Sequence, residues 1–253
     1  MTDLAGLAAL AGRAAREAGA LLKGRPERVD HKGAVDLVTE IDLASERVIR
    51  DILAREAPGI AIQGEEGGGA VSGTRWAVDP VDGTTNFVHG YPFYCVSIGL
   101  IEGTTPVVGA IYDPVRDRLL VGWQGGGATV NGAPLAVSTV RTLDAALSVT
   151  GFPYDRRERA AFYLARVQRA MEQTHGVRRS GSAAMDLATI ATGCAELFWE
   201  LHLKPWDTAA GVLLVREAGG VVTRIDGSAW TPDAADVLAT NGWVHAAAIG
   251  MLG

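Results

Sequence analysis

Apolar residues recur every three or four positions near the start of the chain. This spacing predicts amphipathic helices over residues 3–23 and 40–56, each with one apolar face. The polar stretch over 30–36 lies between them and predicts a loop. Pro58 stops the second helix, because proline cannot continue the helical hydrogen bonds.

Short apolar runs bounded by turn residues follow in the rest of the first half and predict strands. They cover 60–62, 94–101, 107–112 and 118–123, and the Asn131-Gly132 pair signals a hairpin. Consecutive strands without helices between them are typical of an antiparallel sheet. We therefore predict such a sheet for this half.

The second half mixes helical and strand-like patterns and ends with a short helix. Helices are predicted over 156–174, 182–192 and 207–217, and strands over 145–150, 195–201, 220–225 and 236–240. Neither an internal repeat nor a linker is seen. The chain of 253 residues is therefore predicted to form one domain of two halves, about 1–140 and 141–253.

One polar interruption of an apolar strand carries candidate chemistry. The strand is predicted to end at Asp79, because Pro80 cannot donate to a ladder. Asp82 follows, and Gly83 and Thr84 then open a turn with free amides. Carboxylates bind hard cations through oxygen, and free amides at a helix start bind phosphate. The stretch therefore offers a cation site beside a phosphate site, unless it is only an acidic turn without a ligand.

Further acids stand at the ends of predicted elements: Asp42, Glu65, Glu66 and Asp207. If they converge on the same place, two of them ~4 Å apart repel by about 4 kcal/mol at an effective dielectric of ~20. Bound cations would remove that repulsion. Oxygen ligands favour Mg²⁺, with Mn²⁺ as a substitute, over Zn²⁺. Asp207 also suits a structural role, as the N-cap of the helix that it opens.

Three separated motifs resemble the signatures of the inositol monophosphatase family. They are Gly64-Glu65-Glu66, the stretch from Asp79 to Phe87, and the stretch from Trp206 to Gly211. Their order and spacing match over about residues 30–225, and the run over 36–42 also fits. The resemblance implies a layered α-β-α-β-α sandwich, with an antiparallel sheet in the first half and a smaller mixed sheet in the second. It also implies a homodimer and inhibition by lithium.

The same resemblance implies two or three Mg²⁺ ions. The ligands of the first would be Glu65, Asp79 and the Val81 carbonyl, and those of the second Asp79, Asp82 and Asp207. A third, weaker ion would lie near Glu65 and Asp42.

Roles toward the substrate are implied as well. Thr84 and Glu65, with Asp42, would position and deprotonate the attacking water. The amides of Gly83 and Thr84 would hold the phosphate. Residues that would contact the alcohol half are Gly181, Ser182, Ala183 and Glu200, and further candidates for the site are Lys32 and Glu66.

Composition and charge argue against some classes of partner and location. A net charge of −6 without a basic tract argues against nucleic acid as a partner, and no apolar run is long enough to cross a membrane. Two widely separated cysteines, Cys95 and Cys194, fit a reduced cytoplasmic protein and are expected in the core. His89 and His202 are expected to be structural.

The substrate is expected to be a small phosphate monoester. Glu200 suits a polyol, because a carboxylate accepts hydrogen bonds from neighbouring hydroxyls. Thr84 and Thr85 after Gly83 also resemble the inositol type, so we predict hydrolysis of myo-inositol monophosphate. Lys204 departs from that pattern and keeps fructose 1,6-bisphosphate open. Histidinol phosphate also stays open as a substrate, as does a non-catalytic role as a metal-binding regulatory protein.

Overall fold

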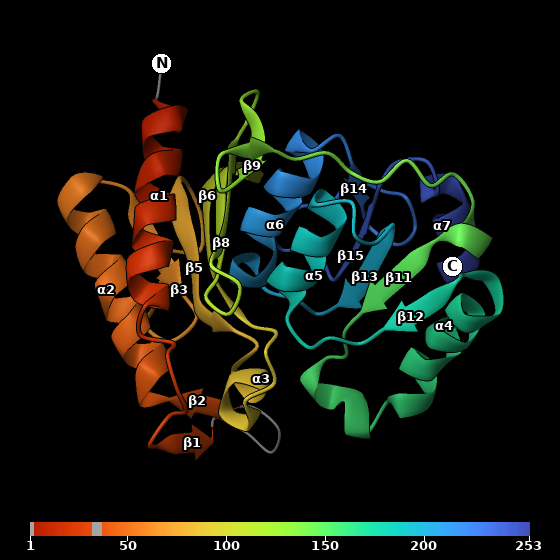
Figure 1. Ribbon diagram of the computed structural model, residues 1–253, viewed down its shortest axis with the longest axis horizontal. Helices are drawn as coiled ribbons and strands as arrows, with labels where there is room; N and C mark the ends of the chain where they lie inside the picture. Colours follow the sequence, from red (N-terminus) through yellow and green to blue (C-terminus); the bar gives the residue numbers. More distant parts are fainter. Residues whose placement is uncertain (1–2, 32–36) are drawn as a thin grey trace.

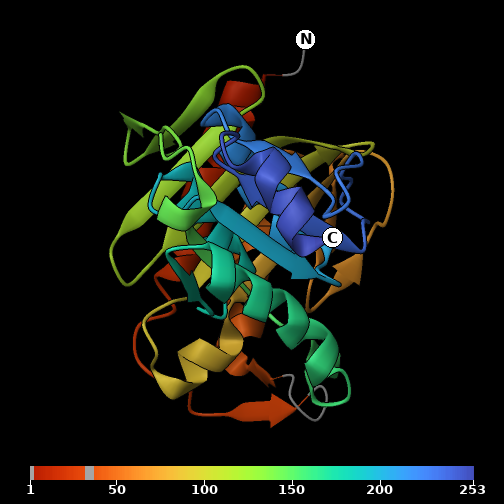
Figure 2. The same ribbon diagram turned by 90° about the vertical axis from the view of Figure 1, so that its right-hand side faces the viewer.

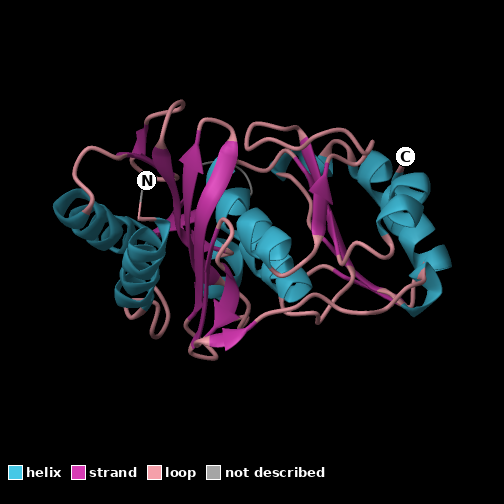
Figure 3. Cartoon of the chain, turned by 90° about the horizontal axis from the view of Figure 1, so that it is seen from above, coloured by secondary structure: helices cyan, strands magenta, loops and turns pink. Residues whose placement is uncertain are grey.

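The structure is a computed structural model that describes residues 3–31 and 37–253. Its elements stack in five layers, seen edge-on in Figure 3: helices, a large sheet, helices, a small sheet and helices. From the first to the last helical layer, the pairs are α1 (Leu4–Gly19) with α2 (Glu40–Glu56), α5 (Ala183–Ala191) with α6 (Pro205–Glu217), and α4 (Ala160–Gln173) with α7 (His245–Leu252). This arrangement confirms the predicted sandwich. Figure 2 shows α4 and α7 in front of the small sheet.

The large sheet has eight strands in the described part of the chain, in the order β10-β9-β8-β7-β6-β5-β3-β4. Their bounds are β3 (Ala61–Gly64), β4 (Gly68–Gly69), β5 (Arg75–Asp82), β6 (Cys95–Glu102), β7 (Thr105–Asp113), β8 (Arg118–Trp123), β9 (Gly127–Val130) and β10 (Ala133–Pro134). Asn131 and Gly132 turn β9 into β10, as predicted. One pairing departs from the antiparallel prediction: β3 runs parallel to β5.

The small sheet is mixed and, among the described residues, has five strands in the order β12-β11-β13-β15-β14. Their bounds are β11 (Leu147–Thr150), β12 (Gly176–Arg178), β13 (Leu197–Leu201), β14 (Val221–Thr223) and β15 (Asp236–Thr240). A two-stranded ribbon of β1 (Val29–His31) and β2 (Leu37–Thr39) precedes α2, and the short helix α3 (Thr84–His89) follows β5. Strand β1 includes residues 30 and 31 of the loop predicted over 30–36, and β2 begins at the residue after that range.

Helices cover both faces of the central strands, which are therefore buried over nearly their whole length. Strand β5 is buried over its whole length, and only the last residue of β6 is exposed. Glycines let α6 approach: a Cβ at Gly99 would lie 2.7 Å from the Ala209 Cβ, and one at Gly109 would lie 2.6 Å from the Ala210 carbonyl oxygen. The Ser97 hydroxyl also donates to the Trp206 carbonyl at 3.0 Å. The start of α6 is thereby held against the large sheet.

Two element boundaries near the acidic residues differ from the prediction. Strand β5 continues to Asp82, because its register against β6 shifts between Asp79 and Asp82 and Pro80 needs no regular ladder bond there. Helix α6 begins at Pro205, which suits a first turn because its amide would have no helical acceptor. Asp207 is therefore the third residue of the helix and was wrongly predicted as its N-cap.

Two other helices are shorter than predicted. The first, expected over 3–23, ends at Gly19, and the one expected over 156–174 begins at Ala160 after the 3₁₀ turn Tyr154–Arg157. The placement of one cysteine was also wrong. Cys95 is buried in the core, but Cys194 is exposed in the turn after α5.

Candidate active site

A pocket of about 400 Å³ lies between the two halves of the chain, at the end of β5. Its lining from the first half includes Glu65, Asp79, Asp82 and Thr84. The lining from the second half includes Ser182, Glu200, Lys204 and Asp207. The pocket therefore brings together the three motifs that the sequence carries far apart.

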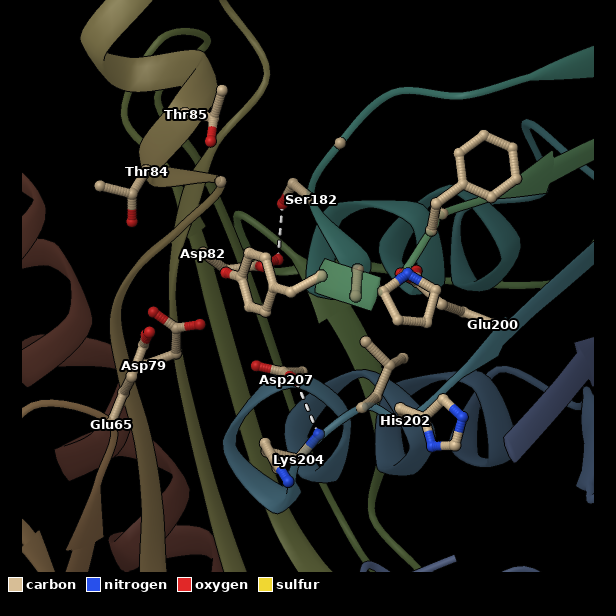
Figure 4. Close-up of a pocket in the computed structure, with 18 of the residues that line it drawn as sticks. Glu65, Asp79, Asp82, Thr84, Thr85, Ser182, Glu200, His202, Lys204 and Asp207 are labelled. Carbon is tan, nitrogen blue, oxygen red and sulfur yellow. Dashed lines mark hydrogen bonds between the residues drawn. The ribbon is translucent and has the colours of Figure 1, made fainter. Parts of the chain in front are cut away.

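Three carboxylates converge in this pocket. Asp79 and Asp82 come from the end of β5, Asp207 comes from the first turn of α6, and each offers an oxygen within 4.8 Å of the other two. Glu65, which follows β3, points toward Asp79 (Figure 4). The register shift of β5 lets both of its aspartates reach the same pocket. Convergence, on which the metal prediction depends, is thus observed.

Each of the three aspartates is oriented by donors in its surroundings. Asp82 Oδ2 accepts from the Ser182 hydroxyl and from the Ala184 amide, both at 2.6 Å. Asp207 Oδ2 accepts from the Lys204 amide at 2.7 Å, and Asp79 Oδ1 from the amide two residues later at 2.9 Å. Because one oxygen of each carboxylate is anchored, its second oxygen has a defined direction.

Burial and mutual repulsion disfavour the charged forms of these acids. Burial raises the pKa of Asp79 well above its ordinary value, and Glu65, Asp82 and Asp207 raise it further. Burial, followed by the charge of Asp82, likewise raises the pKa of Asp207 well above its ordinary value. The pKa of Asp82 rises to about 6 through burial, and the bond from Ser182 limits the rise. An all-oxygen cluster with such repulsion fits a hard divalent cation.

A hydroxyl stands beside the cluster at the start of α3. Gly83 precedes α3 with φ of 99°, and a Cβ there would lie 3.2 Å from the Phe93 carbonyl oxygen. The Thr84 hydroxyl lies 3.1 Å from Asp42 Oδ1 and 3.0 Å from the Val81 carbonyl oxygen, and can donate to one of them at a time. Burial raises the pKa of Asp42. This arrangement can orient a water molecule next to the acids.

The second half of the chain forms another side of the pocket. Gly181, Ser182, Ala183 and Glu200, the residues for which substrate contacts are predicted, all line the pocket. Glu200 lies on β13 and is 7% exposed; a Cβ at Gly151 would lie 2.1 Å from its Oε2. Burial, and then the charge of Asp186, raises the pKa of Glu200 well above its ordinary value.

Several residues of the pocket were missed or lie elsewhere. Arg156 and Arg179 line the pocket, although the sequence shows them only as charges in a polar region. Asp186 is a buried acid near Asp82 and Glu200, and its place in a helix gives no signal of that burial. Glu66 does not belong to the pocket lining among the described residues, whereas His202 does. Lys32 lies outside the described residues.

Comparison with known proteins identifies the family. The sequence profile of the inositol monophosphatase family matches residues 3–251. The chain belongs to the inositol monophosphatase family. A relative from Synechocystis, named inositol-1-monophosphatase, is 46% identical over 228 residues, or 88% of this chain and 79% of that one.

Other members of the family differ in name. A relative from Escherichia coli, named Nus factor SuhB, is 43% identical over 227 residues, covering 86% of this chain and 85% of the relative. The solved structure of inositol monophosphatase from Anabaena is similar with a TM-score of 0.90 and 43% identity, covering 99% of this chain and 96% of that one. Family membership supports a metal-dependent phosphatase that acts on small phosphate monoesters. In the described part of the chain, the helices are too short or too polar to cross a membrane.

Proposed function

We propose that the chain hydrolyses myo-inositol monophosphate to inositol and phosphate, with Mg²⁺ as cofactor. The observation that carries this proposal is the convergence of Asp79, Asp82 and Asp207 to within 4.8 Å, beside the Thr84 hydroxyl. Glu200 lines the same pocket and would contact the alcohol half of the substrate. The name of the Synechocystis relative supports the choice of substrate.

The acids of the pocket divide into two ligand sets. Glu65, Asp79 and the Val81 carbonyl would hold one ion, and Asp79, Asp82 and Asp207 would hold a second. When bound, a pair of divalent ions neutralises the phosphate, lowers the pKa of a water molecule and stabilises the leaving oxygen. Oxygen donors favour Mg²⁺ or Mn²⁺ for this role.

The water is positioned by the protein. The Thr84 hydroxyl would donate its hydrogen bond to Asp42, so that a lone pair of the Thr84 oxygen accepts from the attacking water and fixes its direction. Glu65 then receives a proton from that water. A third, weaker ion near Glu65 and Asp42 belongs to the same proposal. The amides of Gly83 and Thr84 open α3 and would donate to the phosphate oxygens.

The experiment that tests the proposal measures phosphate release with and without Mg²⁺. The substrates are inositol 1-phosphate, fructose 1,6-bisphosphate, histidinol phosphate and adenosine 3′,5′-bisphosphate. We expect release that depends on Mg²⁺ and is fastest for inositol 1-phosphate. No release from any of the four would instead support a non-catalytic, metal-binding role, which stays open because the Escherichia coli relative is not named as a phosphatase.

A second candidate substrate is fructose 1,6-bisphosphate. Three cationic residues, Arg156, Arg179 and Lys204, line the pocket and could bind a second phosphate. The same cations would repel histidinol phosphate, whose amine is positively charged. If the bisphosphate is the substrate, Arg179→Ala and Lys204→Ala should each lower its kcat/KM about tenfold and leave that for inositol 1-phosphate within about twofold.

The remaining features of the proposal concern the protein as a whole. We expect a cytoplasmic homodimer that is inhibited by lithium. Unpaired Cys95 and Cys194 support a reducing compartment. Sedimentation of the purified chain tests the dimer.

A further inference from the structure

Helix α2 contacts the segment from Asp79 to Thr84, which supplies part of the pocket lining. Asp42 reaches Thr84, and the Ser45 hydroxyl donates to the Pro80 carbonyl at 3.2 Å. One turn after Asp42, Glu46 is only 3% exposed, although it is an acid. The proposed reaction uses Asp42 and gives Glu46 no role.

The Glu46 carboxylate accepts hydrogen bonds from the loop that follows β3. Its Oε2 accepts from the Glu66 amide at 2.8 Å, and its Oε1 accepts from the Gly67 amide at 2.9 Å and from Arg50 Nε at 2.6 Å. Arg50 Nη2 donates in turn to the Gly68 carbonyl at 2.7 Å. We call Glu46 and Arg50 the α2 clamp. The clamp binds three successive residues of the loop to one helix.

The clamp accounts for the glycines of the motif. A Cβ at Gly64 would lie 2.4 Å from Glu46 Oε1, and a Cβ at Gly67 would lie 2.6 Å from the same atom. Neither glycine has a positive φ, so backbone strain does not demand glycine at these positions. Glycine is needed because the clamp occupies the space that a Cβ would take. Both ends of the Glu65-Glu66 pair are therefore shaped by Glu46.

Glu65 is consequently held from both sides. Its amide donates to the Val78 carbonyl at 3.1 Å, immediately before Asp79 in β5, and the next two amides are held by Glu46. The Glu65 side chain points toward Asp79 (Figure 4). Strand pairing on one side and the clamp on the other fix where the Glu65 carboxylate lies relative to Asp79.

We propose that Glu46 is a positioning residue that holds Glu65 beside Asp79 and thereby strengthens binding of divalent cations in the pocket. The proposal rests on the proposed function of the acidic cluster as a Mg²⁺ site. Mutation of residues that orient metal ligands without contacting the metal typically lowers metal affinity or activity by about 10- to 100-fold. Without the Glu46 carboxylate, the Glu66 and Gly67 amides lose their acceptor and the loop that carries Glu65 loses its anchor.

The test is calorimetric titration of Mg²⁺ into the metal-free wild-type chain and into Glu46→Ala. The matched control is Asp113→Ala. Asp113 is 1% exposed and accepts from the Val115 and Arg116 amides at 2.9 and 3.2 Å and from Arg116 Nη1 at 2.9 Å. Like Glu46, Asp113 is a buried acid that accepts from two loop amides and one arginine, but its hairpin turn lies outside the pocket lining. We expect both variants to melt at lower temperature, but only Glu46→Ala to raise the Kd for Mg²⁺, by about tenfold or more.

A second variant, Gly67→Ala, disturbs the clamp from the loop side. Gly67 is exposed, so this variant remains informative even if Glu46→Ala does not fold. We expect it, too, to raise the Kd for Mg²⁺ and the Mg²⁺ concentration that gives half-maximal phosphate release. Wild-type affinity in Gly67→Ala and in any folded Glu46→Ala, or an equal loss in Asp113→Ala, would overturn the proposal. A wild-type chain that neither binds Mg²⁺ nor releases phosphate would overturn the proposed function instead.

Discussion

Replacing Asp79 by asparagine tests two things at once: whether the proposed activity requires this carboxylate, and how much its charge destabilises the metal-free fold. Asparagine has the same shape, and its side-chain oxygen can still accept from the Val81 amide, as Asp79 does at 2.9 Å. The charge that Glu65, Asp82 and Asp207 repel is lost. We therefore expect Asp79→Asn to abolish turnover and, without metal, to stabilise the fold.

The size of this stabilisation follows from the cluster. At 4.8 Å, the limit of separation for the three ligand oxygens, two unit charges repel by about 3.5 kcal/mol at an effective dielectric of ~20. Asp79 can avoid that repulsion by binding a proton, which at pH 7 costs about 4 kcal/mol for a carboxyl with an ordinary pKa. The penalty is therefore limited to about 4 kcal/mol, and we expect a gain of roughly 1–4 kcal/mol. For a chain of this length, 1 kcal/mol shifts Tm by about 2 °C.

The gain must depend on pH in a defined direction. The pKa of Asp79 is raised in the folded protein, so between the unfolded and folded values the folded state binds more protons. Wild-type stability therefore falls as pH rises through that window. The advantage of the asparagine variant should vanish near pH 4 and be largest at pH 7 and above.

The assay is thermal unfolding in EDTA at pH 4 and pH 7.5, together with phosphate release in Mg²⁺. Asp51→Asn, which removes an exposed acid of α2, is the control for loss of one charge. With saturating Mg²⁺ the wild type should regain stability, by about 2.7 kcal/mol at 100 times its Kd. An asparagine variant with normal turnover, or one no more stable than wild type in EDTA at pH 7.5, would refute this reasoning.

Four further predictions test other parts of the site. Thr84→Ala should lower kcat about 100-fold with little change in Tm, whereas Thr85→Ala should keep kcat within about twofold of the wild type. Equal kcat values for the two variants would contradict a water-positioning role for Thr84. Gly151→Ala places a Cβ 2.1 Å from Glu200 Oε2 and should raise KM for inositol 1-phosphate about tenfold, and an unchanged KM would contradict it. Li⁺ should inhibit phosphate release by competing for a cation position, and a flat dose response would speak against it. In the native chain one thiol, that of exposed Cys194, should react with a thiol reagent; two reactive thiols would show that the other is accessible.

Elements whose signals are local were predicted well from the sequence. Helix α2 spans Glu40–Glu56, the predicted range, because Thr39 caps it and Pro58 prevents its continuation. Strands β6 and β7 of the large sheet were found because helices cover both of their faces, and strands in that position have long, mostly apolar runs. Strands β1, β2, β4 and β12 were missed, since two or three residues are too few to show a period.

What could not be predicted is decided by partners distant in sequence. The continuation of β5 through Pro80 depends on the register of β6, which periodicity does not report. The burial of Asp186 depends on packing around α5. Convergence of Asp207 with Asp82 was expected through the family resemblance alone, because spacing along the chain contains no information about it. Cys194 was placed in the core because its neighbours are apolar, whereas the turn after α5 exposes it.

The structural and chemical roles of two aspartates are compatible because a carboxylate has two oxygens. Asp207 Oδ2 accepts from the Lys204 amide and so caps α6, and Asp42 Oδ2 accepts from the Thr39 amide and so caps α2. The other oxygen of Asp42 faces Thr84, and Asp207 supplies an oxygen to the acidic cluster. Helix starts also favour negative charge, because their unpaired amides carry partial positive charge. The fold thus holds these acids by their capping bonds at the places where the proposed reaction would use them. Asp207 does stabilise the start of its helix, although from the third helical position and not from the N-cap.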